Sequence, residues 1–183
     1  MNYLQVMGTK NISVVVAIVL TGFILGCDPP REFCDDMATF ARVPDLIILE
    51  PLQDTYNKGD VITLKTSIAN ISPYFAEPNV NLLEVTGLQN ALLVSNNRLY
   101  EGNGLEFLTG SQGRISNWFN MPYNPETDRY EFELKMTLNR VGNYNFITAE
   151  FIDIIGEDCN RYRIETNIAG ANADSRIEFE VLE

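Results

Sequence analysis

Residues 129–138 read RYEFELKMTL, and apolar and polar side chains alternate along this stretch. Because successive side chains of a β-strand point to opposite faces, the pattern predicts a strand with one apolar and one polar face. The apolar face consists of Tyr130, Phe132, Leu134, Met136 and Leu138. Such strands are typical of antiparallel sheets that cover a core on one face and contact water on the other.

The same alternation appears at residues 61–68, after a turn at residues 57–60, and again at residues 177–181. No long segment shows a helical pattern, and turn-forming residues recur at short intervals. We therefore expect an all-β domain, with a hairpin turn at residues 101–104 and longer loops at residues 120–125 and 169–174. The weaker strand candidates are residues 45–50, 81–85, 91–94, 98–100, 105–108, 115–119, 144–152 and 161–167.

The residues that follow the first stretch indicate a more specific fold. Leu138 ends one strand and Tyr144 opens the next, with Gly142 between them. This arrangement resembles the tyrosine corner of immunoglobulin-like and fibronectin-type domains, in which the tyrosine hydroxyl bonds to the backbone. The resemblance implies an antiparallel Greek-key β-sandwich, with extra strands or long loops because the domain exceeds about 100 residues. An unrelated hairpin with Gly142 in its turn is the alternative.

The composition places the chain among globular proteins and excludes several functions. Of its 183 residues, 45% are hydrophobic and 21% are charged, which is ordinary for a globular domain. The net charge of −12 would repel a polyanion, so we expect no binding to nucleic acid. The chain contains no histidine, which excludes histidine-dependent catalytic triads and histidine-ligated zinc.

The N-terminal region has the features of a signal peptide. An uncharged apolar stretch, residues 12–25, lies between Lys10 and Cys27, and translation starts at Met1 or at Met7. A helix of this length reaches about 21 Å, which is shorter than a hydrocarbon core of about 30 Å. The stretch is therefore predicted to be removed and not to span a membrane permanently.

The residues Ile24-Leu25-Gly26-Cys27 resemble the lipobox of bacterial lipoproteins. The resemblance implies cleavage before Cys27, a diacylglyceryl thioether on its sulfur, and acylation of the new amino terminus with a fatty acid such as palmitate. Several acyl chains, at about 0.8 kcal/mol per buried CH₂, hold a domain firmly on a membrane. The implied location is the bacterial cell envelope, and we expect the outer membrane. The resemblance does not determine in which leaflet the lipid is inserted. An ordinary secretory signal peptide is the alternative.

This processing divides the chain into a signal peptide at residues 1–26, a lipidated tether at residues 27–42 and a β-sandwich at residues 43–183. Two cysteines then remain, Cys34 and Cys159, in a chain exported to an oxidising compartment. Their pairing is the simplest expectation, and a loop of this length would stabilise the fold by about 4–5 kcal/mol. Two unpaired buried thiols are the alternative.

Three aromatic residues, Trp118, Phe119 and Tyr123, lie in or beside a predicted loop. Aromatic rings bury a large area and stack on sugars or receive peptides, so these residues are a candidate binding platform. The competing interpretation places the single tryptophan in the core of the sandwich.

Two sets of acidic residues are candidate chemical sites. Asp153, Glu157 and Asp158 offer oxygen ligands for Ca²⁺, but they lack EF-hand spacing, and solvated acids without metal are the favoured interpretation. Paired glutamates on one strand face lie about 6.6–6.8 Å apart along the chain, within the range of inverting glycosidases. Such pairs are ordinarily the solvated face of a sheet; they are Glu131 with Glu133 and Glu178 with Glu180.

These observations favour a non-catalytic module that a lipid anchors to the membrane and that engages an envelope protein partner without a cofactor. Loops between Gly102 and Asp128 are the expected contact region, because loops of a sandwich vary without disturbing its core. A glycan-binding accessory lipoprotein of a polysaccharide-uptake system, with Trp118 and Tyr123 as platforms, is the alternative. An envelope hydrolase that uses the paired acids is the third hypothesis.

Overall fold

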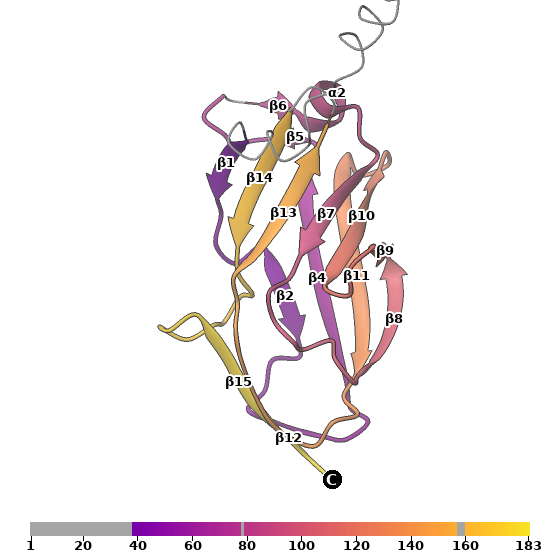
Figure 1. Ribbon diagram of the computed structural model, residues 1–183, viewed down its shortest axis with the longest axis vertical. Coiled ribbons are helices and arrows are strands. Elements are labelled where there is room, and N and C mark those ends of the chain that lie inside the picture. The colour runs from indigo at the N-terminus through magenta and orange to yellow at the C-terminus, as the bar shows by residue number, and fades with distance from the viewer. Residues whose placement is uncertain (1–37, 78, 157–159) are drawn as a thin grey trace, which may run out of the picture.

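The computed structural model describes residues 38–77, 79–156 and 160–183, and nearly all regular structure in this part of the chain is β-strand (Figure 1). The all-β prediction is therefore confirmed. The strands are β1 (Thr39–Arg42), β2 (Ile47–Glu50), β3 (Thr55–Asn57), β4 (Val61–Ala69), β5 (Ile71–Ser72), β6 (Val80–Asn81), β7 (Asn90–Val94), β8 (Gly104–Thr109), β9 (Ser111–Gln112), β10 (Trp118–Asn124), β11 (Arg129–Thr137), β12 (Gly142–Ile147), β13 (Glu150–Ile155), β14 (Arg161–Thr166) and β15 (Arg176–Leu182).

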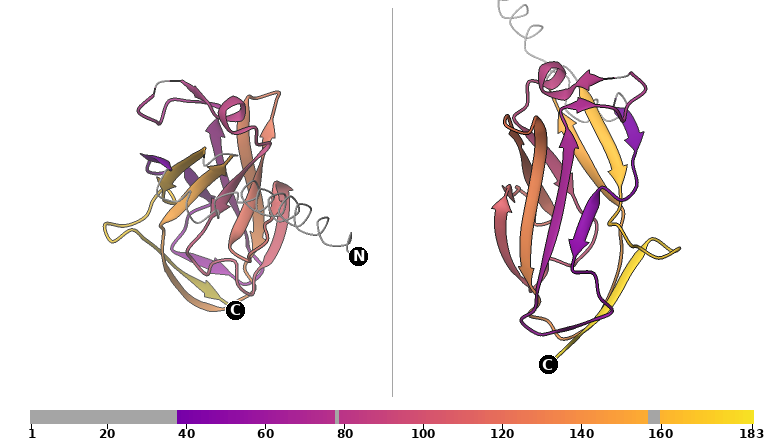
Figure 2. Two further views of the ribbon diagram at one scale, coloured as in Figure 1. Left: turned by 45° about the horizontal axis from the view of Figure 1, so that its top comes forward. Right: turned by 180° about the vertical axis from the view of Figure 1, so that it is seen from behind.

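The largest sheet follows the order β1-β14-β13-β7-β10-β11-β4-β2 and folds over into two layers that pack together (Figure 2). The layers meet at the β10–β11 hairpin, where Tyr123 pairs with Tyr130. Further along β11, the neighbouring strand is β8 and no longer β10. One layer therefore contains β8, β11, β4 and β2, and the other contains β1, β14, β13, β7, β10 and β9.

The apolar faces of the two layers enclose the core. Strand β11 buries every second residue, so the strand predicted at residues 129–138 is confirmed, apart from Leu138, which is buried just after its end. The ring of Phe132 on β11 lies 5.4 Å from the ring of Phe119 on β10. Burial of a large apolar side chain stabilises a fold by about 1.5–3 kcal/mol. These inward-facing residues therefore hold the two layers together.

A smaller sheet of order β12-β15-β3 continues the molecule beyond the ends of β13 and β14. The ribbon of β12 and β13 is interrupted at Thr148 and Ala149. In the small sheet the rings of Tyr144 and Phe179 stack at 4.7 Å. The hydroxyl of Tyr144 donates to the Arg140 carbonyl oxygen at 3.1 Å. The small sheet is therefore fixed to the strand connection that precedes it.

The strand predicted at residues 81–85 is wrong, because residues 82–86 form the helix α2 (Leu82–Thr86). The Asn81 side chain accepts a hydrogen bond from the Glu84 amide, and Gly87 ends the helix with a φ of 69°. An asparagine N-cap and a left-handed glycine are the usual signals of helix ends. These end signals indicate a helix in a segment that is too short for its hydrophobic periodicity to distinguish a helix from a strand.

Three further features of the structure differ from the sequence predictions. Residues 120–124 continue strand β10 instead of forming a loop, and Pro122 is opposite Asn90 of β7. Residues 98–100 form part of a connection and not a strand. The sheet also begins before residue 43, because Thr39 at the start of β1 is paired in parallel with Tyr162 of β14.

The described residues form an elongated body with two distinct ends (Figure 1). We call the end that carries α2, β5 and β6 the N-terminal pole, because β1 starts near it. The opposite end, which we call the C-terminal pole, carries β3, β12 and the chain's C-terminus. Within the described residues, no helix has the length and apolar character needed to cross a bilayer.

Candidate functional site

Several residues singled out in the sequence lie outside the described part of the chain. They are Cys27, Cys34, Glu157, Asp158 and Cys159. The structure therefore says nothing about the lipidation site, the disulfide or two of the three acids proposed for Ca²⁺.

Asp153, the third of those acids, is buried on β13 and bonded to two arginines. Its carboxylate accepts hydrogen bonds of 3.1 and 2.6 Å from Arg161 and of 3.1 and 2.7 Å from Arg163. The guanidinium of Arg163 also lies 4.3 Å from the ring centre of Phe151. Among the described residues, no group of three or more His, Cys, Asp or Glu side chains is placed to hold a metal ion. The contacts make Asp153 a structural anion of the sheet.

The aromatic residues Trp118, Phe119 and Tyr123 do not form one platform. Phe119 is fully buried in the core, whereas its neighbour Trp118 points to the opposite face of β10 and is half-buried. The ring of Tyr123 packs on Tyr130 at 5.5 Å, and its hydroxyl donates to Asp128 at 2.8 Å. Because adjacent residues of a strand face opposite sides of the sheet, Trp118 faces away from Phe119 and Tyr123, and the three rings cannot stack on one ligand together.

The expected contact region between Gly102 and Asp128 is likewise not one surface. Strands β8, β9 and β10 occupy most of it. The β7–β8 connection that contains Gly102 runs to the C-terminal pole (Figure 1). Asp128 accepts a hydrogen bond from Asn70, which in turn bonds to the amide of Leu83 in α2 at the N-terminal pole. The two ends of the region are therefore at opposite poles.

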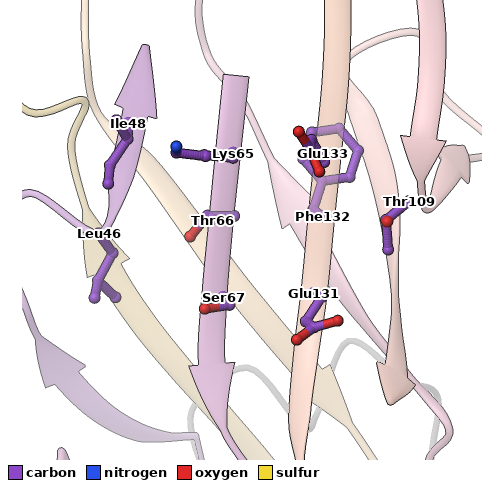
Figure 3. A pocket seen from close by; sticks show the side chains of 9 residues that line it. All are labelled: Leu46, Ile48, Lys65, Thr66, Ser67, Thr109, Glu131, Phe132 and Glu133. Carbon is purple, nitrogen blue, oxygen red and sulfur yellow. The ribbon is translucent and has the colours of Figure 1, made fainter. Parts of the chain in front are cut away.

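The paired glutamates of β11 lie on an outer face of the sheet, over a groove of about 360 Å³ (Figure 3). Glu131 accepts hydrogen bonds from Asn124 at 2.9 Å and from Thr127 at 2.8 Å. Across the groove, Lys65 is ion-paired with Glu50 at 2.6 Å. Catalytic pairs require one desolvated acid, and this open face provides no such environment.

The second pair, Glu178 and Glu180, is on the outer face of β15. Both side chains are exposed, and Glu178 accepts a hydrogen bond of 2.9 Å from Asn145 of β12. This pair has the placement of a solvated sheet face.

A second groove of about 540 Å³ lies where the ribbon of β12 and β13 is interrupted. It combines the ring of Phe151 with polar side chains from β1, β13 and β14 of one layer and from the connections beside them. Its polar lining includes Arg42, Asn96, Thr148, Glu150, Glu165 and Asn167. Arg42 and Glu165 form an exposed ion pair of 2.8 Å with each other.

Glu150 is the unusual residue of this groove, because its side chain is buried with 2% exposure. Its Oε1 accepts a hydrogen bond of 2.7 Å from the Asn97 amide and a longer one of 3.4 Å from the Ser95 hydroxyl. No donor or acceptor among the described residues lies within hydrogen-bonding distance of its Oε2. A buried carboxyl with a free oxygen is disfavoured in the charged form.

Burial raises the pKa of Glu150 from 4.5 to about 7, and the hydrogen bonds from Asn97 and Ser95 partly oppose this shift. Burial also raises the pKa of the nearby Tyr100 hydroxyl, and the carboxylate of Glu150 adds to that effect. The Glu150 carboxyl is therefore poised to change its charge near neutral pH.

Glu150 is not predicted from the sequence, because it belongs neither to the paired glutamates nor to the acidic cluster. The sequence does carry one signal of its burial, which is the position of Glu150 in the alternating pattern of a strand. Glu150 shares the inward face of β13 with the buried Ile152 and Ile154. An acid at a core-facing position of a strand is unusual and indicates a buried carboxyl.

The described residues define an all-β domain of packed sheets, with one groove beside β11 and another beside β13. No protein-family model and no curated protein sequence matches the chain.

Proposed function

We propose that this protein is a bacterial envelope lipoprotein, anchored through lipid on Cys27, whose β-domain binds a protein partner without catalysing a reaction. The observation that carries the proposal is the lipobox-like sequence Ile24-Leu25-Gly26-Cys27 after an uncharged apolar stretch. The paired glutamates support a non-catalytic role, because Glu178 and Glu180 are exposed and Glu131 and Glu133 are only half-buried, so neither pair provides the desolvated acid that catalysis requires.

The position of β1 gives the anchored domain an orientation. Residues 28–38 separate Cys27 from β1 and reach at most about 40 Å when extended. Because β1 starts near the N-terminal pole, that pole faces the membrane in our proposal (Figure 1). The C-terminal pole then points away from the membrane, and we assign partner binding to its loops.

We further propose that the domain is an immunoglobulin-like Greek-key sandwich. The first two strands, β1 and β2, support this proposal because each pairs with a different layer. Strand β1 pairs in parallel with β14 of one layer, and β2 pairs antiparallel with β4 of the other. The hydrogen bond from the Tyr144 hydroxyl to the Arg140 carbonyl is the interaction that a tyrosine corner makes.

The register of β1 and β14 supports a disulfide between Cys34 and Cys159. The two strands are parallel, and Thr39 is opposite Tyr162. Cys34 precedes Thr39 by a few residues, and Cys159 precedes Tyr162 by a similar number. Both cysteines thus precede their strands at the same end of the parallel pair, and on this ground we propose that they are bonded to each other.

Metabolic labelling with an alkyne fatty acid tests the anchor. We expect the native protein and a Cys34→Ala variant to carry the label and to sediment with membranes. A Cys27→Ala variant should lose the label and keep its uncut signal peptide. Labelling of Cys27→Ala at the native level would refute the proposal.

Site-specific photo-crosslinking in intact cells tests the partner surface. A photoreactive residue at Arg140, on the C-terminal pole, should give a discrete adduct with an envelope protein, and one at Glu84 of α2 should give none. Adducts that form from Glu84 and not from Arg140 would contradict the assignment. If the protein binds glycans on an array and neither photoreactive residue gives an adduct, the glycan-binding alternative is favoured.

A further inference from the structure

The connection between β7 and β8, residues 95–103, is held against the sandwich by several hydrogen bonds, including those of Ser95 with Asn117 and of Asn96 with the Ala149 carbonyl. At its start, Asn97 and Ser95 donate hydrogen bonds to the buried carboxyl of Glu150. At its end, the Asn103 amide donates to the Leu99 carbonyl at 2.7 Å, and its oxygen accepts from the amide of Asn139. Glu150 is therefore one attachment of the first half of this loop, and it is the one whose charge can change.

The loop covers one end of the core. Leu99 and Tyr100 are both buried, with 1% and 7% exposure, and the ring of Tyr100 lies 4.6 Å from that of Phe119. The side chain of Asn97 also accepts a hydrogen bond of 3.0 Å from the Leu99 amide. A change at Glu150 is therefore transmitted through Asn97 to the residues that close the core.

Burial makes ionisation of Glu150 costly while the loop is closed, and this cost exceeds what the hydrogen bonds from Asn97 and Ser95 to the carboxylate return. Among the described residues, no group is hydrogen-bonded to Oε2. Glu150 also lines the groove of about 540 Å³, so its carboxyl lies next to solvent-accessible space. An ionised carboxylate gains solvation by loosening these contacts.

We propose that Glu150 is a proton-controlled latch, which in its neutral form holds the loop of residues 95–103 on the sandwich and releases that loop when its proton is lost to solvent. The latch does not depend on the lipid anchor. It makes the loops of the C-terminal pole more mobile in neutral and alkaline surroundings than in mildly acidic ones.

The other charged and titratable groups nearby do not replace this role. Tyr100 is the titratable group that shares the buried surroundings of Glu150. Within the loop, Arg98 and Glu101 lie 4.0 Å apart and are both exposed. On the groove's outer side, Arg42 and Glu165 pair with each other.

The size of the effect follows from the two protonation states of Glu150. The carboxyl titrates near 7 when the loop is closed and near its ordinary 4.5 when the loop is open and the carboxyl is solvated. Linkage between these values makes opening about 30-fold more favourable at pH 8.5 than at pH 5.5.

Hydrogen exchange on the full chain tests the latch. Protection factors, corrected for the pH dependence of intrinsic exchange, are compared at pH 5.5 and 8.5 for peptides covering residues 95–103 and, as an internal reference, β11. We expect loop protection to fall about 30-fold at the higher pH, while β11 changes less. In Glu150→Gln the loop should stay protected at both pH values, and the matched variant Glu165→Gln should behave as the native protein.

Three results would overturn the latch. The first is native loop protection that does not change with pH, and the second is an unchanged pH effect in Glu150→Gln. The third comes from ¹³C NMR of side-chain carboxyls in the native protein, which needs no variant. A Glu150 carboxyl that titrates fully below pH 5.5 would refute the proposal even if Glu150→Gln failed to fold.

Discussion

Replacing Asp153 with asparagine should weaken the fold strongly, because this buried carboxylate is bonded to two guanidinium groups. The side chain is 3% exposed and accepts hydrogen bonds from Arg161 and Arg163. Asparagine keeps the shape and one acceptor oxygen but removes the charge. Losing one partner of a buried ion pair typically destabilises a protein by about 3–5 kcal/mol. Since part of the geometry survives in Asp153→Asn, we expect a loss of about 3 kcal/mol.

Urea denaturation of the native and variant chains measures this difference in the free energy of unfolding. In thermal denaturation of a domain of this size, a loss of about 3 kcal/mol lowers the melting temperature by about 6–12 °C. Glu165→Gln is the matched control, because it removes a carboxylate from the exposed ion pair with Arg42. Exposed pairs contribute at most about 1 kcal/mol and are weakened by salt.

The comparison of the two variants decides whether the reasoning is right. The loss in Asp153→Asn should persist in 1 M salt, whereas any loss in Glu165→Gln should shrink there. If Asp153→Asn unfolds within about 1 kcal/mol of the native chain, the carboxylate does not stabilise the sheet in the way its contacts indicate.

Four further predictions address other parts of the molecule. The free energy of unfolding should fall by about 3 kcal/mol as the pH rises from 4.5 to 7, because native Glu150 keeps a proton that the unfolded chain releases; urea titrations of Glu150→Gln should lack this fall. Non-reducing electrophoresis should show faster migration of the exported protein than of its reduced form, and no such shift in Cys34→Ala or Cys159→Ala. Tyr144→Phe removes one hydrogen bond to the backbone and should lower stability by about 1 kcal/mol in thermal denaturation, with equal stability as the contradicting result. Phe119→Ala empties a fully buried position and should destabilise the chain by about 3–5 kcal/mol; a loss below 1 kcal/mol would place the ring outside the core.

The strands with strong alternation could be predicted from the sequence, and the reason is physical. Along β11 and β4, one face is buried and the other contacts water, so burial imposes a period of two on the sequence. The helix α2 could not be read from periodicity because it is only one turn long, although Asn81 and Gly87 carried its end signals. Pro122 suggested a loop, but it occupies a strand that is bent between the two layers.

The candidate site was harder to predict because it depends on contacts between distant segments. Glu150 meets Asn97 and Ser95 across a long stretch of chain, and no local pattern shows that proximity. The aromatic platform failed for a simpler reason. Trp118 and Phe119 are adjacent in a strand, and adjacent residues face opposite sides of a sheet.

The parallel pairing of β1 with β14 also determines how the domain would respond to mechanical force. A pull on the chain ahead of Thr39 acts along the length of β1, and the register places Thr39 to Arg42 beside Tyr162 to Glu165. Under such a load the bonds between these strands are sheared together instead of being unzipped one after another. Tension on the chain ahead of Thr39 would therefore be resisted at β1 before it reaches the rest of the sandwich.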